Sequence, residues 1–215
     1  MLRQVRPAVV LLILLSALAG LLYPLAITGI AQAVLPYQAN GSLLGKVGAP
    51  VGSVLIGQNF AADRYFHGRP SATQAQDPAH PDDSSKTIDA PYNAANSVGS
   101  NLGPTSQKLL DRVKADVDAK RAAGWTGPIP ADSVTSSASG LDPHISPDNA
   151  YAQAATVAKA RSLPIEKVRA LIDAHVEGRA LGWVGEPRVN VLRLNMALDV
   201  LAAQSPTASL APTQP

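Results

Sequence analysis

Apolar and polar positions divide this chain into one long apolar run and a longer mixed part. No charged residue occurs between Arg6 and Lys46, and residues 8–35 are almost wholly apolar. A helix needs about 20 apolar residues to cross the hydrocarbon core of a bilayer. This run is longer, and it lacks the polar face that a surface helix of a water-soluble protein carries. We therefore predict a transmembrane helix over residues 8–35.

A cleaved signal peptide is the alternative interpretation of the same run. Arg3 and Arg6 form a basic start, and residues 17–19 read A-L-A, which fits an A-x-A cleavage pattern. However, the chain stays apolar as far as Leu35, whereas the apolar segment of a signal peptide ends near its cleavage site. We therefore expect the segment to be retained as an anchor, with a kink or one lost backbone hydrogen bond at Pro24.

The charges beside the apolar run predict its orientation. Arg3 and Arg6 precede it, and positive charge next to a first helix is retained in the cytoplasm. We therefore expect residues 1–7 in the cytoplasm, a single pass through the lipid of the cell inner membrane, and an extracytoplasmic domain over residues 36–205. Residues 206–215 are rich in proline and small polar residues, which predicts a disordered tail.

The segments that follow the anchor suggest short strands and turns. Residues 52–60, GSVLIGQNF, are a compact apolar run between glycines, which is typical of a buried strand. Residues 65–72, YFHGRPSA, are expected to form a structured turn in which Arg69 is a fixed hydrogen-bonding side chain, and the alternative is a contact of Arg69 with an anion or a partner. Residues 73–90 are polar and broken by prolines, so we expect a mobile surface loop.

Four later segments show the spacing of apolar residues that is typical of amphipathic helices. They begin at Thr105 or Ser106, at Ser146, at Pro164 and at Asn190, and the first two end near Gly124 and Arg161. On the first helix, the residues expected to face solvent are Lys108, Arg112, Lys114, Asp116 and Asp118. In the last segment, residues 189–194 also alternate as a strand would, but the leucine spacing favours a helix. The prediction is an α+β fold, with one transmembrane helix followed by a single mixed α/β domain.

Composition excludes one class of partner. The net charge is +2 and the aromatic content is 4%. Nucleic-acid-binding domains need a basic patch, and single-strand binders also need aromatic platforms. We therefore expect no nucleic-acid partner. The chain has no cysteine, and because exported domains without disulfides are common in bacteria, this absence does not distinguish between compartments.

Several polar stretches resemble binding or catalytic sites. Residues 96–110 combine glycines with hydroxyls, but the G-x-x-x-x-G-K-[ST] pattern of a phosphate-binding loop is missing. His80 with Asp82 and Asp83 could bind a metal only weakly. Asp142 and His144 lack a third ligand at a useful spacing. We therefore predict no metal site.

A Ser-His-Asp catalytic set stays open at this point, because such a set is recognised by geometry rather than by spacing. No nucleophile-elbow motif supports it. The stretch LDPHISPDNA, residues 141–150, serves mainly to direct the chain into a helix, since Ser146 suits an N-cap and Pro147 a first helical position. A free-standing exported hydrolase that uses His144 or His175 is therefore the alternative function.

A family resemblance emerges from a series of short stretches in one order along the chain. They are YPL, QANGSL, GSVLIGQNF, YFHGRPSA, YN with SNLGPTS, VTSSASGLDPHISP, VAKARSL and GEPRVNVLRLNMALD. Together they cover most of residues 1–201. With these motifs the chain resembles the KdpC family of accessory subunits of the bacterial Kdp high-affinity potassium-transporting P-type ATPase. It departs from the family pattern at residues 73–90, where a short link is usual.

The resemblance implies an accessory, non-catalytic subunit with one membrane helix. Its implied partners are a channel-like potassium-translocating subunit, a P-type ATPase subunit and one further, very small subunit. Members of the family are described as catalytic chaperones that raise the ATP affinity of the P-type ATPase subunit, and the stretch from Ser136 to Gly140 has been likened to a nucleotide signature. Ser137, Ser139 and Gly140 are therefore the candidate nucleotide contacts. An extracytoplasmic domain conflicts with such a contact, so we expect no tightly bound cofactor.

Overall fold

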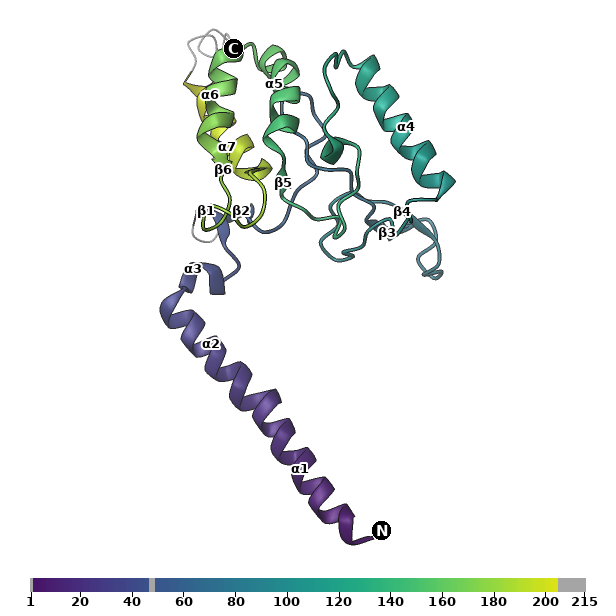
Figure 1. The fold of residues 1–215 in the computed structure, drawn as a ribbon, viewed down its shortest axis with the longest axis vertical. Coiled ribbons are helices and arrows are strands. Elements are labelled where there is room, and N and C mark those ends of the chain that lie inside the picture. The colour runs from purple at the N-terminus through teal and green to yellow at the C-terminus, as the bar shows by residue number, and fades with distance from the viewer. Residues whose placement is uncertain (1, 47–48, 205–215) are drawn as a thin grey trace, which may run out of the picture. The chain divides into compact units, whose positions relative to one another are not determined.

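The computed structural model describes residues 2–46 and 49–204 and contains two compact units, which divide between Ser53 and Val54 (Figure 1). The first unit contains a helix over Val5–Val34 that is long and apolar enough to cross a membrane. The short helix η1 (Leu2–Gln4) precedes this long helix. The long helix consists of α1 (Val5–Ala17), the π-helical turn η2 (Leu18–Leu22) and α2 (Tyr23–Val34). The predicted apolar helix is thus confirmed. The predicted tail, residues 206–215, lies outside the described residues.

The interruption predicted at Pro24 takes the form of this wide turn. The backbone nitrogen of Tyr23 donates to the carbonyl oxygen of Leu18, five residues back. A proline ring clashes with the carbonyl four residues before it and has no N–H to donate. Widening the preceding turn to a π-type bond gives the ring room, so the helix continues through Pro24 to Val34.

A small hairpin completes the first unit, and it corrects one prediction. After α3 (Pro36–Ala39), strands β1 (Leu43–Lys46) and β2 (Ala49–Ser53) pair antiparallel. The buried strand predicted over residues 52–60 is wrong beyond Ser53, because residues 54–60 form turns in which Leu55 is 61% exposed.

The glycine at position 57 is required by the packing of Tyr92 and not by a strand. A Cβ on Gly57 would lie 2.5 Å from a ring carbon of Tyr92, so the glycine permits a close approach.

Residues 73–90 also differ from the prediction, because they contain a hairpin instead of an unstructured loop. Strands β3 (Gln74–Gln76) and β4 (Thr87–Asp89) pair antiparallel, with Gln74 opposite Asp89. The Asp77 and Asp83 carboxylates cap the connection by accepting hydrogen bonds from the backbone nitrogens of Ala79 and Ser85. Such Asx turns order the connection through local hydrogen bonds. In the sequence the same polar residues look like those of a loop.

The second unit has helices packed on a small antiparallel sheet. Its remaining elements are α4 (Gln107–Ala122), η3 (Ala131–Ser133), β5 (His144–Ile145), α5 (Pro147–Arg161), α6 (Ile165–His175), β6 (Val176–Glu177), β7 (Arg188–Asn190) and α7 (Val191–Ala203). The sheet order is β5-β7-β6. In Figure 1, α5, α6 and α7 lie together, whereas α4 lies apart from them. The predicted α+β fold is confirmed.

The core fills the space between the three helices and β7. Residues without exposed surface include Phe66, Val168, Ile172, Val189, Leu194 and Leu198. Two predicted caps form, since Ser146 Oγ accepts from the backbone nitrogen of Asn149 and Asn190 Oδ1 accepts from that of Arg193. The cap predicted at Thr105 or Ser106 is wrong, because Ser106 precedes α4 but its side chain makes no cap hydrogen bond. Both interpretations of the last segment hold in part, since β7 ends at Asn190 and α7 begins at the next residue.

Candidate functional site

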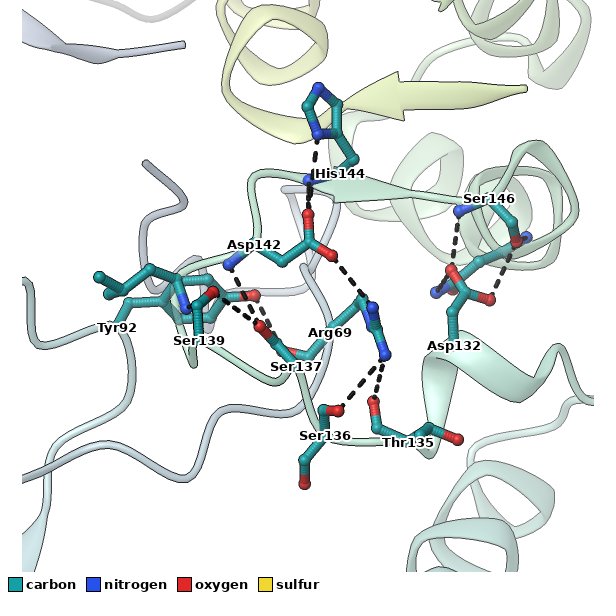
Figure 2. A network of polar contacts seen from close by, with 12 residues as sticks. Arg69, Tyr92, Asp132, Thr135, Ser136, Ser137, Ser139, Asp142, His144 and Ser146 are labelled. Carbon is teal, nitrogen blue, oxygen red and sulfur yellow. Dashed lines mark hydrogen bonds and ion pairs between the residues drawn. The ribbon is translucent and has the colours of Figure 1, made fainter. Parts of the chain in front are cut away.

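The serine-rich loop over residues 136–140 connects η3 to β5 and lies beside Arg69 and Tyr92 (Figure 2). Ser137 is 1% exposed and Gly140 is buried, whereas Ser139 is exposed. The three candidate nucleotide contacts of the sequence therefore lie in one tight loop, but only one of them is at the surface.

The hydroxyls of Ser137 and Ser139 bind backbone groups that follow them in the chain. Ser137 Oγ accepts from the backbone nitrogen of Asp142 at 3.3 Å, and Ser139 Oγ accepts from that of Leu141 at 3.1 Å. The two hydroxyls also lie 3.2 Å from each other. The backbone nitrogen of Ser137 donates to the Pro70 carbonyl at 2.9 Å. These groups hold the turn closed, so their hydrogen-bonding capacity is directed inward and away from a ligand.

Gly140 is a structural requirement of the loop. Its φ is +68°, and a Cβ there would lie 2.3 Å from Thr73 Cγ2 and 2.8 Å from the Val98 carbonyl. Its own carbonyl accepts from Ser71 Oγ at 2.8 Å. A left-handed conformation and a crowded neighbourhood both select glycine. The need for glycine at this position is thus explained without a bound phosphate.

Arg69 joins the loop to β5 as the fixed hydrogen-bonding residue that the sequence predicts. Its Nη1 lies 3.0 Å from Asp142 Oδ2, and its Nη2 donates to the carbonyls of Ser136 at 3.3 Å and Thr135 at 3.4 Å. The Arg69 and Asp142 side chains are 25% and 28% exposed. Arg69 therefore links its own segment to residues 135–142, which lie far away in the sequence.

Asp142 is held as a carboxylate between Arg69 and His144. Its Oδ1 accepts from the His144 backbone nitrogen at 2.9 Å and lies 3.7 Å from His144 Nδ1. Burial raises the pKa of Asp142, but the hydrogen bonds from His144 and Arg69 outweigh it and lower the pKa below its ordinary value. Asp142 therefore carries a negative charge near pH 7 and positions its neighbours.

Tyr92 is a member of this site that the sequence did not reveal. Its hydroxyl donates to the Arg69 carbonyl at 2.8 Å, and its backbone adopts a φ of +63°. Burial, followed by the charge of Asp142, raises the pKa of Tyr92 to about 12. The phenol is therefore a neutral donor near pH 7. Only the glycines at Gly57 and Gly68, which admit its ring, could have signalled it.

The groups expected for a hydrolase are engaged elsewhere. Within the described ranges, the ring of His144 has no hydrogen bond to a hydroxyl of the serine-rich loop. His175 Nδ1 lies 2.8 Å from the Leu171 carbonyl, which is a contact at the end of α6. His80 pairs with Asp77 at 3.0 Å. The described residues contain no cluster of three or more metal-binding side chains.

A cavity of about 490 Å³ lies beside this network, between the segment around Arg69 and helices α4 and α5. Two α4 residues predicted to face solvent, Arg112 and Asp116, are only 28% and 36% exposed. Arg112 Nη1 binds Asp116 at 2.9 Å and the Val134 carbonyl at 3.2 Å. Their four-residue spacing places both side chains on one helix face. This spacing is the signal in the sequence that could have predicted their ion pair.

Lys120 continues that row and lies over the ring of Trp125, 4.5 Å from its centroid. Burial lowers the pKa of Lys120 despite the opposing effects of Asp116 and Asp132. The row of Arg112, Asp116 and Lys120 therefore makes an ion pair and a cation–π contact, and Asp116 and Lys120 line the cavity. Both contacts are local to α4 and the turn after it, whereas the hydrogen bond from Arg112 to the Val134 carbonyl attaches the helix to a neighbouring segment.

Comparison with known proteins gives matches along almost the whole chain. The family model described as "K+-transporting ATPase, c chain" matches residues 5–200. A "Potassium-transporting ATPase KdpC subunit" of Bradyrhizobium diazoefficiens is 60% identical over 204 residues, which are 95% of this chain and 100% of the relative. Proteins with the same description from Methylobacterium nodulans and Rhodopseudomonas palustris are 59% identical over 204 residues and 58% over 199, with 95% and 93% of this chain and 100% and 98% of the relatives covered.

Proposed function

This chain belongs to the family of K+-transporting ATPase c chains, and we propose that it is the accessory subunit that assembles and stabilises the ATP-driven, high-affinity potassium uptake complex. Its partners are the channel-like potassium-translocating subunit, the P-type ATPase subunit and the very small subunit. The observation that carries the proposal is the match to potassium-transporting ATPase subunits over residues 5–200. A helix of membrane-spanning length supports it, because such a helix can pack against the helices of other membrane subunits.

We propose that this subunit is not itself catalytic. Asp142 is bound by Arg69 and by the His144 backbone, and Tyr92 stays protonated near pH 7. A general acid or base needs a pKa near the working pH and an open path to a substrate. Neither group has such a pKa, so in this proposal the network around Arg69 serves to hold the extracytoplasmic domain in shape.

We further propose that any effect on the ATP affinity of the P-type ATPase subunit arises through assembly and that the serine-rich loop does not bind the nucleotide. Ser137 and Gly140 are buried, and the hydroxyls of Ser137 and Ser139 hold the loop closed. The positive charge of Arg3 and Arg6 favours a cytoplasmic N-terminus and hence an extracytoplasmic loop in the inner-membrane protein. No cofactor is bound tightly in this proposal.

Co-expression of the tagged chain with the other subunits tests the accessory role. We expect these subunits to co-purify in mild detergent and potassium-dependent ATP hydrolysis to be lost when the chain is omitted. A chain that purifies alone, together with hydrolysis that persists in its absence, would refute the role.

Two variants test the absence of catalysis and of nucleotide contact. His144→Ala should leave turnover of the assembled complex largely intact, whereas a loss of about 100-fold or more would be the size expected for a general acid or base and would favour a hydrolytic chain. Ser139→Ala should leave the KM for ATP within about twofold of the wild-type value, because the proposal gives Ser139 no contact with the nucleotide. Loss of a hydrogen bond to a ligand would raise the KM by more than that. A larger rise in KM with normal assembly would revive the nucleotide contact.

A further inference from the structure

The connection between β6 and β7 carries two strongly exposed apolar side chains. Leu181 is 86% exposed and Trp183 is 75% exposed, the highest values among the large apolar side chains in the described part of the chain. Val184 beside them is 44% exposed. Residues 180–184, hereafter the tip, therefore place a leucine, a tryptophan and a valine in water within five consecutive positions. A cluster of this kind marks a surface that another molecule covers.

The tip is a built turn with its own hydrogen bonds. Ala180 and Val184 exchange backbone hydrogen bonds of 2.9 Å in both directions, and the nitrogen of Gly182 donates to the Arg179 carbonyl at 3.1 Å. Below the turn, Arg179 Nη2 lies 2.6 Å from Glu186 Oε2. These contacts fix the backbone that carries Leu181 and Trp183. Binding therefore requires little ordering of this segment, which favours affinity.

Leu181 is unfavourable for the isolated chain in two respects. Its φ is +53°, a left-handed conformation that glycine or asparagine adopts more readily than leucine. Its side chain is also hardly buried, since it is the most exposed of the described large apolar residues. Neither backbone preference nor packing in the free chain accounts for a leucine here. A contact outside the chain accounts for it.

The charges beside the tip indicate the kind of surface that it contacts. Arg179 pairs with Glu186, and Arg188 and Arg193 both reach Glu177, at 3.1 and 3.5 Å. Arginines that bind anionic lipid headgroups offer their charge to phosphate, whereas all three of these contact a glutamate, with Glu177 shared by Arg188 and Arg193 so that one positive charge is in excess. The tip thus presents an uncharged, apolar projection with a central tryptophan. Such a projection fits a desolvated pocket of a protein interface, where tryptophan is enriched.

We propose that the tip docks into an apolar, uncharged pocket on the extracytoplasmic surface of another chain of the K+-transporting ATPase. The proposal rests on the accessory role proposed above, because that role supplies the other chain. Leu181 and Trp183 are the anchors, and the Arg179–Glu186 pair lies at the rim of the contact.

Substitutions that spare the free chain but alter the tip provide the first test. Leu181→Asn should leave the unfolding midpoint of the full chain in detergent unchanged or raised, because asparagine accepts a positive φ. Leu181→Asn and Trp183→Ser should each reduce co-purification with the other chains by about tenfold or more, the size expected when an interface anchor is lost. Leu110→Ser is the matched control, since Leu110 is 56% exposed on α4 and is not part of the tip. It should assemble normally. Normal assembly of both tip variants would overturn the proposal.

Thiol labelling provides the second test, because the chain has no cysteine of its own. Val184→Cys places a single thiol beside both anchors, and Leu110→Cys is its control. A membrane-impermeant maleimide should label the thiol at position 184 at least about tenfold more slowly in the complex than in the free chain, while the control rate stays unchanged. Equal rates in the two states would overturn the proposal. Protection of the free chain in phosphatidylcholine liposomes would also overturn it, because lipid would then be what covers the tip.

The outcomes separate the two proposals. If the wild-type chain fails to co-purify with the other subunits, the accessory role is wrong and the docking of the tip is wrong with it. If the wild-type chain and both tip variants co-purify equally, the accessory role stands and only the tip proposal is overturned.

Discussion

The carboxylate of Asp132 binds Ser146 twice, accepting hydrogen bonds from its backbone nitrogen at 2.7 Å and from its hydroxyl at 2.9 Å (Figure 2). The same carboxylate accepts from Asn149 Nδ2 at 3.1 Å. Ser146 Oγ in turn accepts from the Asn149 backbone nitrogen at 3.1 Å. The first turn of α5 is therefore fixed to η3, and the N-cap has a tertiary role as well as a local one.

This arrangement predicts different costs for two serine N-caps. Ser146→Ala should lower the free energy of unfolding by about 1–2 kcal/mol, because it removes a cap and a bond to Asp132. Ser106→Ala is the matched control, since Ser106 precedes α4 but its side chain makes no cap hydrogen bond. Its cost should stay within about 0.5 kcal/mol. Urea unfolding of the full chain in mild detergent, followed by circular dichroism, measures both, and equal costs would contradict the prediction.

The packing of Tyr92 predicts that Gly68 tolerates no side chain. A Cβ on Gly68 would lie 2.0 Å from Tyr92 Oη, so Gly68→Ala should destabilise the chain by about 1–3 kcal/mol through overpacking. Gly103→Ala should be close to neutral, because its Cβ would meet nothing within 4 Å. Thermal unfolding compares the two.

Tyr92→Phe provides a coupling test for the same contact. It removes the atom closest to the added methyl group, so the combined Gly68→Ala and Tyr92→Phe variant should be more stable than the sum of the single losses. Strict additivity of the two losses would show that the strain lies elsewhere.

The ion pair of Arg69 and Asp142 predicts a loss of stability in acid. The pKa of Asp142 is lower in the folded chain than its ordinary value of 3.8, so the carboxylate stabilises the fold at pH values above 3.8. This contribution is lost as the pH falls through the folded pKa. Asp142→Asn should therefore be less stable than the wild type at about pH 6, and the difference should shrink below about pH 4.

Unfolding midpoints measured across this pH range test the sign. The exposed Asp118→Asn, on α4, is the control substitution, because it changes the net charge by the same amount. Asp77 and Asp83 also have lowered pKa values, but they titrate equally in the wild type and in both variants. A difference between the wild type and Asp142→Asn that grows on acidification would contradict the assignment.

The basic N-terminus predicts the location of the second unit. A reporter that is active only after export should be active when fused after Ala203, because the positive charge of Arg3 and Arg6 favours a cytoplasmic N-terminus. A reporter that is active only in the cytoplasm should be inactive at the same position. The reverse pattern would place the serine-rich loop on the side of ATP and would contradict the proposed role of that loop.

The sequence by itself determined the features that depend on neighbouring positions. The apolar run predicts the helix over Val5–Val34, and the residues Ser146 and Asn190 predict where α5 and α7 begin. These signals are reliable because a membrane span needs only length and apolar composition, and a cap needs only one side chain beside free backbone nitrogens. The family motifs are likewise readable without coordinates.

Only the tertiary structure decided which distant groups meet. The hairpin of β3 and β4 depends on pairing Gln74 with Asp89. The two strands lack the alternation of apolar and polar residues that would predict this register. Arg69 finds its partner 73 positions later, at Asp142. Tyr92 becomes a member of the site because Gly57 and Gly68 leave room for its ring. Long-range contacts of this kind depend on chain closure and shape complementarity, which local spacing does not encode. For the same physical reason, a serine- and glycine-rich stretch that resembles a ligand cradle in sequence is a closed turn in the folded chain.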